Sequence, residues 1–384
     1  MKIAVIGAGP AGLYFSLLQK KHDPSLDIRI YEQNPRDATY GWGVVFSDIG
    51  LGFLKEADPE FFEEFTCGHE RCDYMEIVHR GTHVQVEGNH FSRVARIDML
   101  NTLQRACERL GIRIEYGRRI EDVAPLAAEV DLLIAADGGN SATRTRYAEH
   151  FGPRFEKRRN KFAWYGTRQR FHPASLIFRE TEHGVFIAHS YQYSPDFSTF
   201  LVEVAPEAWQ ASGLDRADEA ESLHHCADVF REELGAHALL SNRSRWFDAN
   251  IVSNEYWSHG NIVLLGDALR TVHFSLGSGT RMAMQDAIAL HQALMTHPRD
   301  RSAALAAFET ARRPASSSFQ TAAARSLDWY ETVSTRMHLD PVRFAYDYMR
   351  RTGRVSHEDL RQRSPHFVAA YEALTVGDLP RLSA

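Results

Sequence analysis

The chain has 384 residues, more than a usual single domain, so we expect one large domain or two interleaved domains with a sizeable core. Apolar residues make up 44% and charged residues 24%, which is ordinary for a globular protein, and the formal charge of −6 gives no support for nucleic-acid binding. No apolar run approaches the roughly 20 residues that cross a bilayer, and the start lacks the features of an export signal. We therefore predict a cytoplasmic protein without a membrane span.

The cysteines receive no predicted role. Their spacing is not typical of a metal site, and two disulfides would be a sparse framework for a chain of this length. A metal site around His69 is conceivable, but unreactive thiols and no bound metal are the simpler interpretation. The four residues are Cys67, Cys72, Cys107 and Cys226.

The opening of the chain is typical of a βαβ unit. A short apolar run at residues 2–6 leads into Gly7-Ala8-Gly9-Pro10-Ala11-Gly12, a helix is expected to about position 21, and a second strand ends at Glu32. Gly7 permits a sharp turn, Gly9 lets a phosphate approach the backbone, and Gly12 lets helix and strand pack closely. The helix, with Pro10 and Ala11 in its first turn, offers unpaired N–H donors to an anion. This spacing predicts a pyrophosphate site.

Glu32 stands 20 residues after Gly12, where a carboxylate can accept hydrogen bonds from the hydroxyls of an adenosine ribose. A 2′-phosphate would be repelled there, so the adenosine of NADP is disfavoured. A solvated glutamate at a strand end is the alternative. Glu32 alone does not separate NAD from FAD.

Further along, the pattern alternates between two kinds of segment. Residues 131–136 form a strand-like run before Asp137-Gly138-Gly139, and a helix is expected over 141–149. Residues 162–204 contain short aromatic and β-branched runs, as expected for an antiparallel sheet. A strand at 261–265 and a helix at 280–294 then resume the earlier pattern, and residues 303–374 are mostly helical. The dinucleotide domain is therefore predicted to be interrupted by a β-rich insertion.

Asp267 favours FAD over NAD. It follows the apolar run 262–265 and so lies at the carboxyl end of a buried strand, where doubly wound sheets bind their ligands. Gly277-Ser278-Gly279-Thr280 then precedes a helix and supplies a second set of backbone donors, for phosphates or for the flavin pyrimidine. A plain Gly-Asp turn is the alternative. Taken with the opening motif, Asp267 predicts a long dinucleotide held along its length.

These segments together resemble the single-component (group A) flavoprotein aromatic hydroxylases, which are typified by p-hydroxybenzoate hydroxylase. Their three signatures are an opening glycine turn, a central Asp-Gly, matched by residues 137–144, and a later Gly-Asp, matched by Gly266-Asp267-Ala268. Arg96 matches an arginine that such enzymes place near FAD. The resemblance implies an α/β fold: a doubly wound, Rossmann-like (GR2-type) FAD-binding domain, an inserted antiparallel β-sheet substrate domain and a helical C-terminal tail.

The expected boundaries follow from this resemblance. The FAD-binding domain would be discontinuous, at 1–72, 92–155 and 255–335, with the substrate domain at 73–91 and 156–254 and a helical segment at 336–384. One departure concerns the later signature, which is commonly followed by Ala-His and then by a proline. Here Leu269-Arg270 and His273-Phe274-Ser275-Leu276 stand instead, so the substrate side is altered.

Within the family, the chain is similar to the branch that contains salicylyl-CoA 5-hydroxylase, the hydroxylase half of 2-aminobenzoyl-CoA monooxygenase/reductase and the tryptophan-derivative hydroxylase of violacein synthesis. The second of these carries a reductase half that is absent here, which favours the first. The shared segments are residues 41–48, 160–167, 273–275 and 336–339.

The resemblance implies how the chemistry runs. FAD is tightly bound and fills the single visible fingerprint, NADH or NADPH binds transiently as reductant, and O2 is the co-substrate, with oxygen delivered through a C4a-hydroperoxyflavin. The difficult chemistry belongs to the cofactor, so no nucleophile triad or metal cluster is required.

Substrate-side candidates are less constrained. His273 is a candidate for a polar catalytic group beside the reacting ring and Phe274 for an apolar wall, with a packing histidine as the alternative. The phosphates of a CoA thioester would need cations, for which Arg158 and Arg159 are candidates, although a charge run is usually a solvated face. The aromatic residues that are candidates to line the ring pocket are Trp164, Tyr165, Tyr191 and Tyr193.

The leading hypothesis is an FAD-dependent, NAD(P)H-consuming monooxygenase that converts salicylyl-CoA to gentisyl-CoA by 5-hydroxylation. Two alternatives stay open: a hydroxylase of 2-aminobenzoyl-CoA or a tryptophan-derived indole, and a non-catalytic FAD-binding interaction module. The expected partner is a small aromatic molecule, and the protein is a monomer or a homodimer.

Overall fold

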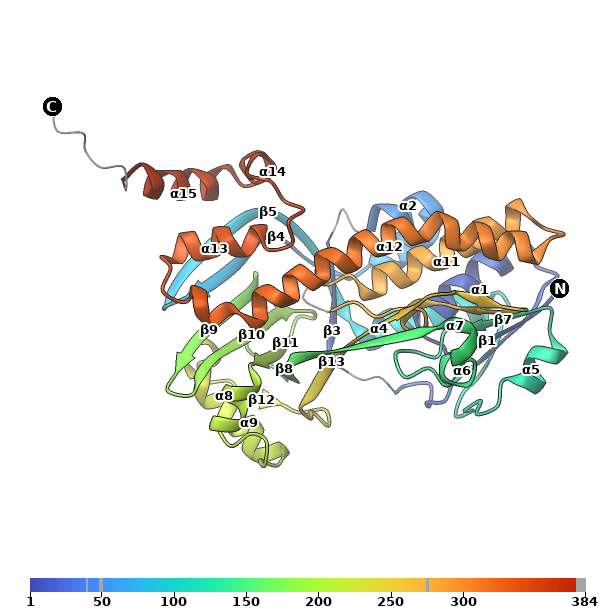
Figure 1. Ribbon diagram of the computed structural model, residues 1–384, viewed down its shortest axis with the longest axis horizontal. Coiled ribbons are helices and arrows are strands. Elements are labelled where there is room, and N and C mark those ends of the chain that lie inside the picture. Colours follow the sequence, from blue (N-terminus) through green and yellow to red (C-terminus); the bar gives the residue numbers. More distant parts are fainter. Residues whose placement is uncertain (39–40, 48–50, 274–275, 378–384) are drawn as a thin grey trace.

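The computed structural model describes residues 1–38, 41–47, 51–273 and 276–377, and it contains two sheets (Figure 1). The first has six strands, all parallel except β14, which is antiparallel to β15. Their order is β14 (Ser258–His259), β15 (Ile262–Leu264), β7 (Leu132–Ala135), β1 (Lys2–Ile6), β2 (Asp27–Tyr31) and β6 (Arg113–Glu115). β1, β7 and β15 carry buried apolar side chains on both faces of the sheet, as expected when helices cover both faces of a parallel sheet.

Helices from distant parts of the chain pack on this sheet. α1 is buried from Ala11 to Gln19 and lies against both α4 and α11, while α11 also packs on α12. One apolar core joins these helices to the strands. The helices of this half are α1 (Pro10–His22), α2 (Gly52–Ala57), α3 (Pro59–Thr66), α4 (Arg96–Arg109), α5 (Ala124–Glu129), α6 (Ala142–Arg146), α7 (Ala148–Phe151), α11 (Gly279–Thr296) and the long α12 (Arg301–Glu331).

The second sheet has nine strands, and β4 and β9 are its one parallel pair in the described chain. The expected sheet was antiparallel throughout. Parallel neighbours need a crossover connection, and here the connection between β4 and β9 includes β7 of the first sheet. The order is β12 (Leu239–Leu240), β8 (Pro153–Thr167), β11 (Ser198–Val204), β10 (Gly184–Gln192), β9 (Ala174–Thr181), β4 (Glu70–His79), β5 (Thr82–Ala95) and β3 (Gly43–Ser47), with β13 (Phe247–Asn254) also paired to β8.

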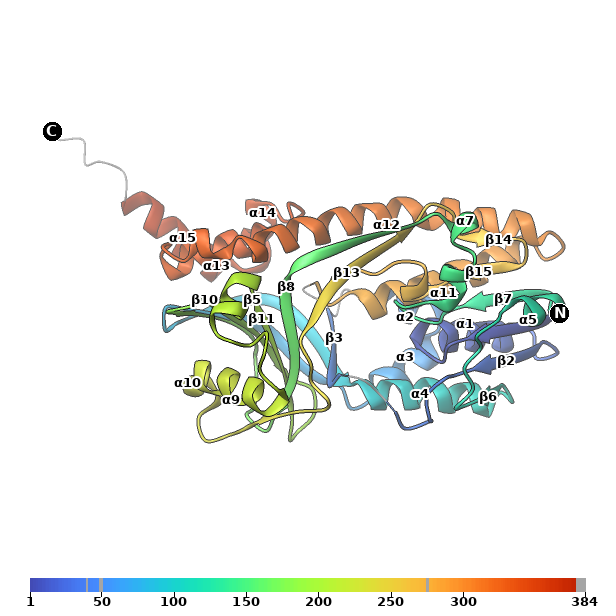
Figure 2. The same ribbon diagram turned by 60° about the horizontal axis from the view of Figure 1, so that its bottom comes forward.

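This sheet uses more of the chain than the substrate segments 73–91 and 156–254. β3, which lies in the segment assigned to the FAD-binding domain, pairs with β5 from Gly43↔Ala95 onward. Figure 2 shows β8 and β13 as long arms that run from the first half of the molecule to the second. β8 is thus continuous across the expected boundary at 155/156, whereas β13 ends at Asn254, at the expected boundary 254/255.

Helices cover both faces of the second sheet. On one face, α8 (Pro206–Ala211), α9 (Glu219–Val229) and α10 (Arg231–Leu234) pack on the side chains that include Tyr165 and Phe186. On the other, the end of α12 packs with η4 (Val333–Arg336), α13 (Pro341–Arg350), α14 (His357–Arg363) and α15 (Pro365–Gly377) on β4, β5 and β9. Within the described residues, no helix combines the length and apolar character needed to span a membrane.

Three glycines fit against aromatic rings where the two halves meet. A Cβ atom on Gly166 of β8 would lie 2.7 Å from the ring of Trp42, and one on Gly43 would lie 2.7 Å from Tyr193. Gly41 faces the ring of Trp164 in the same way, at 3.3 Å. Residues 41–43 and β8 therefore interlock, and only glycine leaves room for the rings.

We predict that Gly166→Ala lowers the free energy of unfolding by about 1–3 kcal/mol, because the new methyl group overlaps the Trp42 ring. The control is Gly52→Ala, since a Cβ there would meet nothing within 4 Å. Denaturant unfolding of both variants measures the difference. Equal midpoints would show that Trp42 has room to move.

Candidate FAD and substrate site

The opening glycines differ in what surrounds them. Gly7 has φ +101°, and a Cβ atom there would lie 2.2 Å from the carbonyl oxygen of Ala136, while one on Gly12 would lie 2.4 Å from the carbonyl oxygen of Gly7. A Cβ on Gly9 would meet nothing within 4 Å. Gly7 and Gly12 thus allow tight packing, and Gly9 leaves open space. Since α1, which begins with Pro10 and Ala11, has no side-chain cap, its first N–H groups face that space.

Glu32 is held at the end of β2 beside this loop. One carboxylate oxygen accepts a hydrogen bond from the N–H of Ala8 at 2.8 Å, and the other accepts two from Asn34, each at 2.8 Å. These bonds fix the orientation of the carboxylate and tie the glycine loop to β2. Each carboxylate oxygen has further lone pairs, so acceptance of ribose hydroxyls remains compatible with the geometry.

The central signature leaves a buried acceptor. One oxygen of Asp137 accepts hydrogen bonds from the backbone N–H and the hydroxyl of Thr143, both at 3.0 Å, while the buried Oδ1 has no hydrogen-bond partner among the described residues. Buried polar atoms are normally paired, so this oxygen is available to a ligand.

Arg144 was not singled out from the sequence, yet it joins the two later signatures. It is 2% exposed and donates to the carbonyl oxygen of Ala268 at 3.0 Å and to that of Gly139. Its place at the end of the segment 137–144 is the signal that could have identified it.

The later signature lies against the first one. Gly266 has φ +61°, and a Cβ atom on it would lie 2.9 Å from the Cβ of Ala11, so the Gly-Asp turn rests directly on α1. Asp267 is an exposed residue, but the protein around its carboxyl group displaces water and raises the pKa of that group. The positive charges of Arg96 and Arg270 lower the same pKa and so partly oppose this shift. Arg96 opens α4 and forms no side-chain hydrogen bond or ion pair within the described residues. The structure thus brings Gly9, Asp267 and Arg96 around one region.

Arg270, at a position where the sequence departs from the family pattern, fixes the turn that carries Asp267. Its guanidinium pairs with the fully buried Asp286 at 2.7 Å, and Arg312 of α12 binds the same carboxylate at 2.8 Å. Buried charges need such partners, so this triad anchors the turn to α11 and α12.

The glycine turn before α11 also has exposed donors. Gly277 has φ +57° and a Cβ there would lie 3.3 Å from Val45, so the turn fits against β3. The hydroxyl of Ser278 donates to the carbonyl of Leu276 at 2.8 Å rather than capping the helix. The first turn of α11, with Gly279 and Thr280, therefore presents uncapped N–H groups.

His273 lies at the junction of the two halves and is 2% exposed. Its ring is 5.2 Å from the ring of Phe162 on β8. Burial is the main cause that holds the pKa of His273 well below its usual range, and the charges of His189, Arg158 and Arg351 lower it further. The imidazole is therefore neutral near pH 7 and has one nitrogen able to accept a hydrogen bond. Phe274, the proposed apolar wall, lies outside the described residues.

A buried polar group near His273 was missed from the sequence. Glu203 of β11 is fully buried, and its oxygens bind Nε2 of His189 at 2.9 Å and Nδ2 of Asn160 at 2.7 Å. The available signal was a single acid within the apolar run 200–204.

The four predicted aromatic residues do not share one pocket. Trp164 and Tyr191 are on the face of the sheet that meets residues 41–43: the Tyr191 hydroxyl donates to the Gly43 carbonyl at 2.8 Å, and the buried Trp164 Nε1 has no acceptor among the described residues. Tyr193 packs on Gly43, and burial raises the pKa of both Tyr191 and Tyr193 to about 12. Tyr165 points to the opposite face, under α8–α10, because adjacent strand residues alternate.

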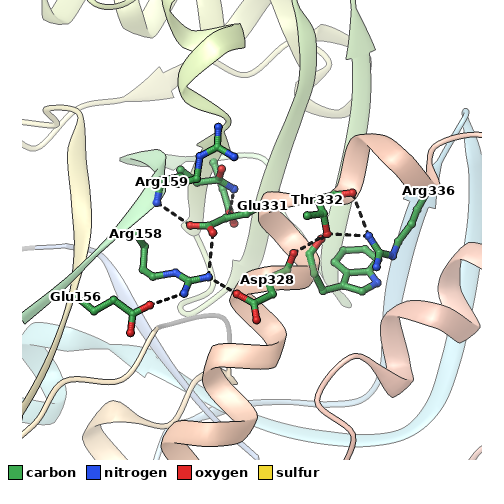
Figure 3. A network of polar contacts seen from close by, with 10 residues as sticks. Glu156, Arg158, Arg159, Asp328, Glu331, Thr332 and Arg336 are labelled. Atoms are coloured by element: carbon green, nitrogen blue, oxygen red, sulfur yellow. Dashed lines mark hydrogen bonds and ion pairs between the residues drawn. The ribbon is translucent and has the colours of Figure 1, made fainter.

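The arginines proposed to bind CoA phosphates already have acidic partners. Arg158 binds Glu156 at 2.6 Å, Asp328 at 2.5 Å and Glu331 at 2.9 Å (Figure 3). Arg159 pairs with Glu207. Lys157 and Lys161, in the same run, both pair with Asp248. These charges join β8 to α8, α12 and β13, so the run is a structural junction.

The residues present fit a long dinucleotide with a flavin. The carboxyl ends of β1, β7 and β15 are surrounded by the open space at Gly9 and by two uncapped helix starts. An oxygen of Asp137 and the side chain of Arg96, neither of which has a partner among the described residues, lie there too. Together, fold and site define an FAD-binding flavoprotein.

Comparison with known proteins agrees. The family described as FAD binding domain matches residues 118–323. Salicyloyl-CoA 5-hydroxylase of Streptomyces sp is 37% identical over 92% of this chain and 70% of its own length. A 3-hydroxy-4-methyl-anthranilyl-[aryl-carrier protein] 5-monooxygenase of Streptosporangium sibiricum is 34% identical (94% and 97%), and protodeoxyviolaceinate monooxygenase of Chromobacterium violaceum is 36% identical (91% and 94%).

Among solved structures, 2-methyl-3-hydroxypyridine-5-carboxylic acid oxygenase has the same fold, with a TM-score of 0.71 and 18% identity over 94% of this chain and 97% of that one. The chain belongs to the single-component flavoprotein aromatic hydroxylases. It is an FAD-dependent monooxygenase, of a class that uses NAD(P)H and O2, and its substrate is a small aromatic molecule.

We predict that Gly9→Ala leaves the stability of the apoprotein nearly unchanged but weakens FAD binding by about tenfold or more, because the methyl group enters the space into which the pyrophosphate fits. Gly12→Ala is the matched comparison and destabilises the apoprotein, because its Cβ would overlap a backbone oxygen. Flavin absorbance after dialysis and denaturant unfolding of the apoprotein separate the two effects. Full FAD retention by Gly9→Ala would contradict this binding mode.

Proposed function

We propose that the protein hydroxylates an aromatic acyl-CoA thioester, and that it converts salicylyl-CoA to gentisyl-CoA by oxidation at ring position 5. The observation that carries the proposal is the similarity to salicyloyl-CoA 5-hydroxylase, which extends over 92% of the chain. The neutral, buried His273 beside Phe162 supports it, because a phenol ring needs a hydrogen-bond acceptor next to an apolar wall. We favour NADH as reductant, and a supply of reduced nicotinamide is consistent with a cytoplasmic enzyme.

The residues of the chain have separate tasks in this proposal. The glycine loop and Glu32 bind the pyrophosphate and ribose of FAD, while Asp137, Arg96, Asp267 and the turn 277–280 hold the rest of the cofactor. Reduced FAD supplies the chemistry that activates O2 for transfer to the ring.

The substrate ring lies between the inner face of β8 and β10 and the segment of His273. The neutral imidazole accepts the hydrogen bond of the phenol hydroxyl, which increases electron density on the ring. Trp164, with its unpartnered Nε1, and Tyr191 border this region. The interlocked residues 41–43 pack against this face of the sheet.

A second candidate is hydroxylation of 2-aminobenzoyl-CoA or of a tryptophan-derived indole. The similarity to an anthranilyl-carrier 5-monooxygenase favours the first and the similarity to protodeoxyviolaceinate monooxygenase favours the second. The aromatic core of the substrate, rather than the cofactor chemistry, separates these alternatives.

A substrate panel tests the proposal. We expect salicylyl-CoA to accelerate NADH oxidation strongly and to give a product with one additional ring oxygen, identified as gentisyl-CoA by mass spectrometry and NMR. Free salicylate, 2-aminobenzoyl-CoA and tryptophan serve as comparisons. Hydroxylation of only a free acid or an indole would make the thioester assignment wrong.

His273→Gln tests the proposed acceptor. We expect product formation to fall by about 10–100-fold with FAD still bound, since the amide oxygen of glutamine is a much weaker base than the imidazole nitrogen and polarises the phenol hydroxyl less. The same variant can be followed by its stability. The pKa of His273 in the folded state lies below its unfolded value of about 6.5. Below pH 6.5 the unfolded chain therefore binds a proton that the folded protein does not, and the native protein loses stability as the pH falls. His273→Gln removes this loss, up to about 1.4 kcal/mol per pH unit.

The control for both measurements is His90→Gln, because His90 is exposed and remote from the site. Unchanged turnover in His273→Gln would remove the histidine from the reaction. An unchanged stability slope between pH 7 and pH 5 would show that it is not buried in the neutral form.

A further inference from the structure

A large cavity lies among the C-terminal helices, apart from the flavin loops. It has a volume of about 1170 Å³ and is bordered by the end of α12, η4, α13, α14 and Tyr371 of α15. Its charged lining side chains are nine: three aspartates, at positions 328, 347 and 359, and six arginines, Arg325, Arg336, Arg343, Arg350, Arg351 and Arg354. The lining is therefore strongly positive.

The three aspartates together do not neutralise the six arginines of the lining. Asp328 binds Arg158 outside the cavity, as Figure 3 shows, and Asp359 accepts hydrogen bonds from Ser356 at the start of α14. Asp347 binds Arg336 at 2.9 Å and the indole N–H of Trp329 at 2.6 Å.

Three arginines are left with unneutralised charges. Arg325, Arg350 and Arg354 are exposed, and none forms an ion pair with an acid in the part of the chain that the structure describes. Exposed arginines are usually solvated, but here they converge on one concave space. Guanidinium groups in such an arrangement are suited to phosphate, to which they donate paired hydrogen bonds.

A stacked pair of aromatic residues also lines the cavity. The rings of Tyr346 and Tyr371 stack with centroids 3.6 Å apart and planes 7° from parallel, and Arg350 lies 5.6 Å from the Tyr346 centroid. Aromatic rings beside cations are typical of sites that bind a nucleobase next to phosphates. The chemistry of the lining is that of a nucleotide site.

The wall of the cavity reaches the surroundings of His273. Arg351 lines the cavity, and its charge is one of those that lower the pKa of His273. Arg158, which has the same effect on His273, binds Asp328 of the cavity wall. Arg351 also lies 5.8 Å from the ring centroid of Tyr330, which is 5.2 Å from that of His189. A substrate with its ring at His273 and a flexible arm directed along these residues would place its far end at these helices.

We infer that this cavity binds the 3′-phospho-ADP end of an acyl-CoA, with Arg325, Arg350 and Arg354 holding the phosphates and the Tyr346–Tyr371 pair facing the adenine. The choice of CoA rests on the proposed function. The arm of a carrier protein has a single phosphodiester, whereas CoA has a pyrophosphate and a 3′-phosphate, which match several unpaired arginines. The site replaces the one that the sequence indicated at Arg158 and Arg159, whose charges are already paired.

The test uses FAD-loaded enzyme and the variant R350A/R354A. We expect the Kd for free CoA, measured by calorimetry, to rise by about tenfold or more, and the KM for the thioester to rise while kcat, FAD content and the KM for NADH stay constant. The charge-matched control is R113A/R299A, whose exposed arginines lie on the other half of the molecule. R350K/R354K, which keeps the charge, should recover part of the affinity and guards against a folding defect.

Dephospho-CoA and a carrier protein loaded with the aryl group complete the experiment. Weaker binding of dephospho-CoA than of CoA, with the difference lost in R350A/R354A, supports the inference. An unchanged Kd for CoA in that variant overturns it, as does a change confined to the KM for NAD(P)H or for the carrier protein. Loss of CoA binding in the variant, without hydroxylation of salicylyl-CoA by the parent enzyme, would refute the proposed function alone.

Discussion

One buried guanidinium determines how the flavin-binding loops are placed. Arg144 donates to the carbonyls of Gly139 and Ala268, which follow the neighbouring parallel strands β7 and β15. Burial lowers the pKa of Arg144, and the nearby charge of Asp137 opposes that shift. Because both loops bind one rigid, planar group, the separation between Asp137 and the turn of Asp267 is fixed before any cofactor is bound.

On the substrate side, the arginines differ in whether they have acidic partners. Arg158 and Arg270 have acidic partners and hold α12 against β8 and against the Gly-Asp turn. His273 lies among such groups and is kept neutral, so the site has an acceptor without a competing charge. Arg325, Arg350 and Arg354, which form no ion pair with the residues that the structure describes, lie around the cavity of the C-terminal helices.

The local patterns of the sequence predicted the parts of the fold that depend on local sterics. The turn at Gly7, the helix that follows it and the strand before Asp267 are of this kind, because a missing Cβ or an apolar run determines them directly. What could not be predicted depends on partners far along the chain. Arg158 has one acidic partner nearby in the sequence, Glu156, but its other two partners, Asp328 and Glu331, are 170 and 173 residues away.

Alternation along a strand explains another difference. Trp164 and Tyr165 are adjacent aromatic residues, and nothing in their local pattern distinguishes which one faces the flavin side. In the structure Tyr165 packs toward α9. Glu203 was overlooked for a related reason, since an acid in an apolar strand is informative only when the residues opposite it, His189 and Asn160, are known.

The long strands β8 and β13 have an evolutionary consequence. The chain passes between the two sheets at several points, and β8 and β13 do so together as one paired ladder whose register shifts between Asp248 and Asn250. The substrate-facing half is thus not a separate domain that recombination could remove and replace. In this architecture we therefore expect a new specificity to require substitutions at the inward-facing positions, because no separate domain can be exchanged.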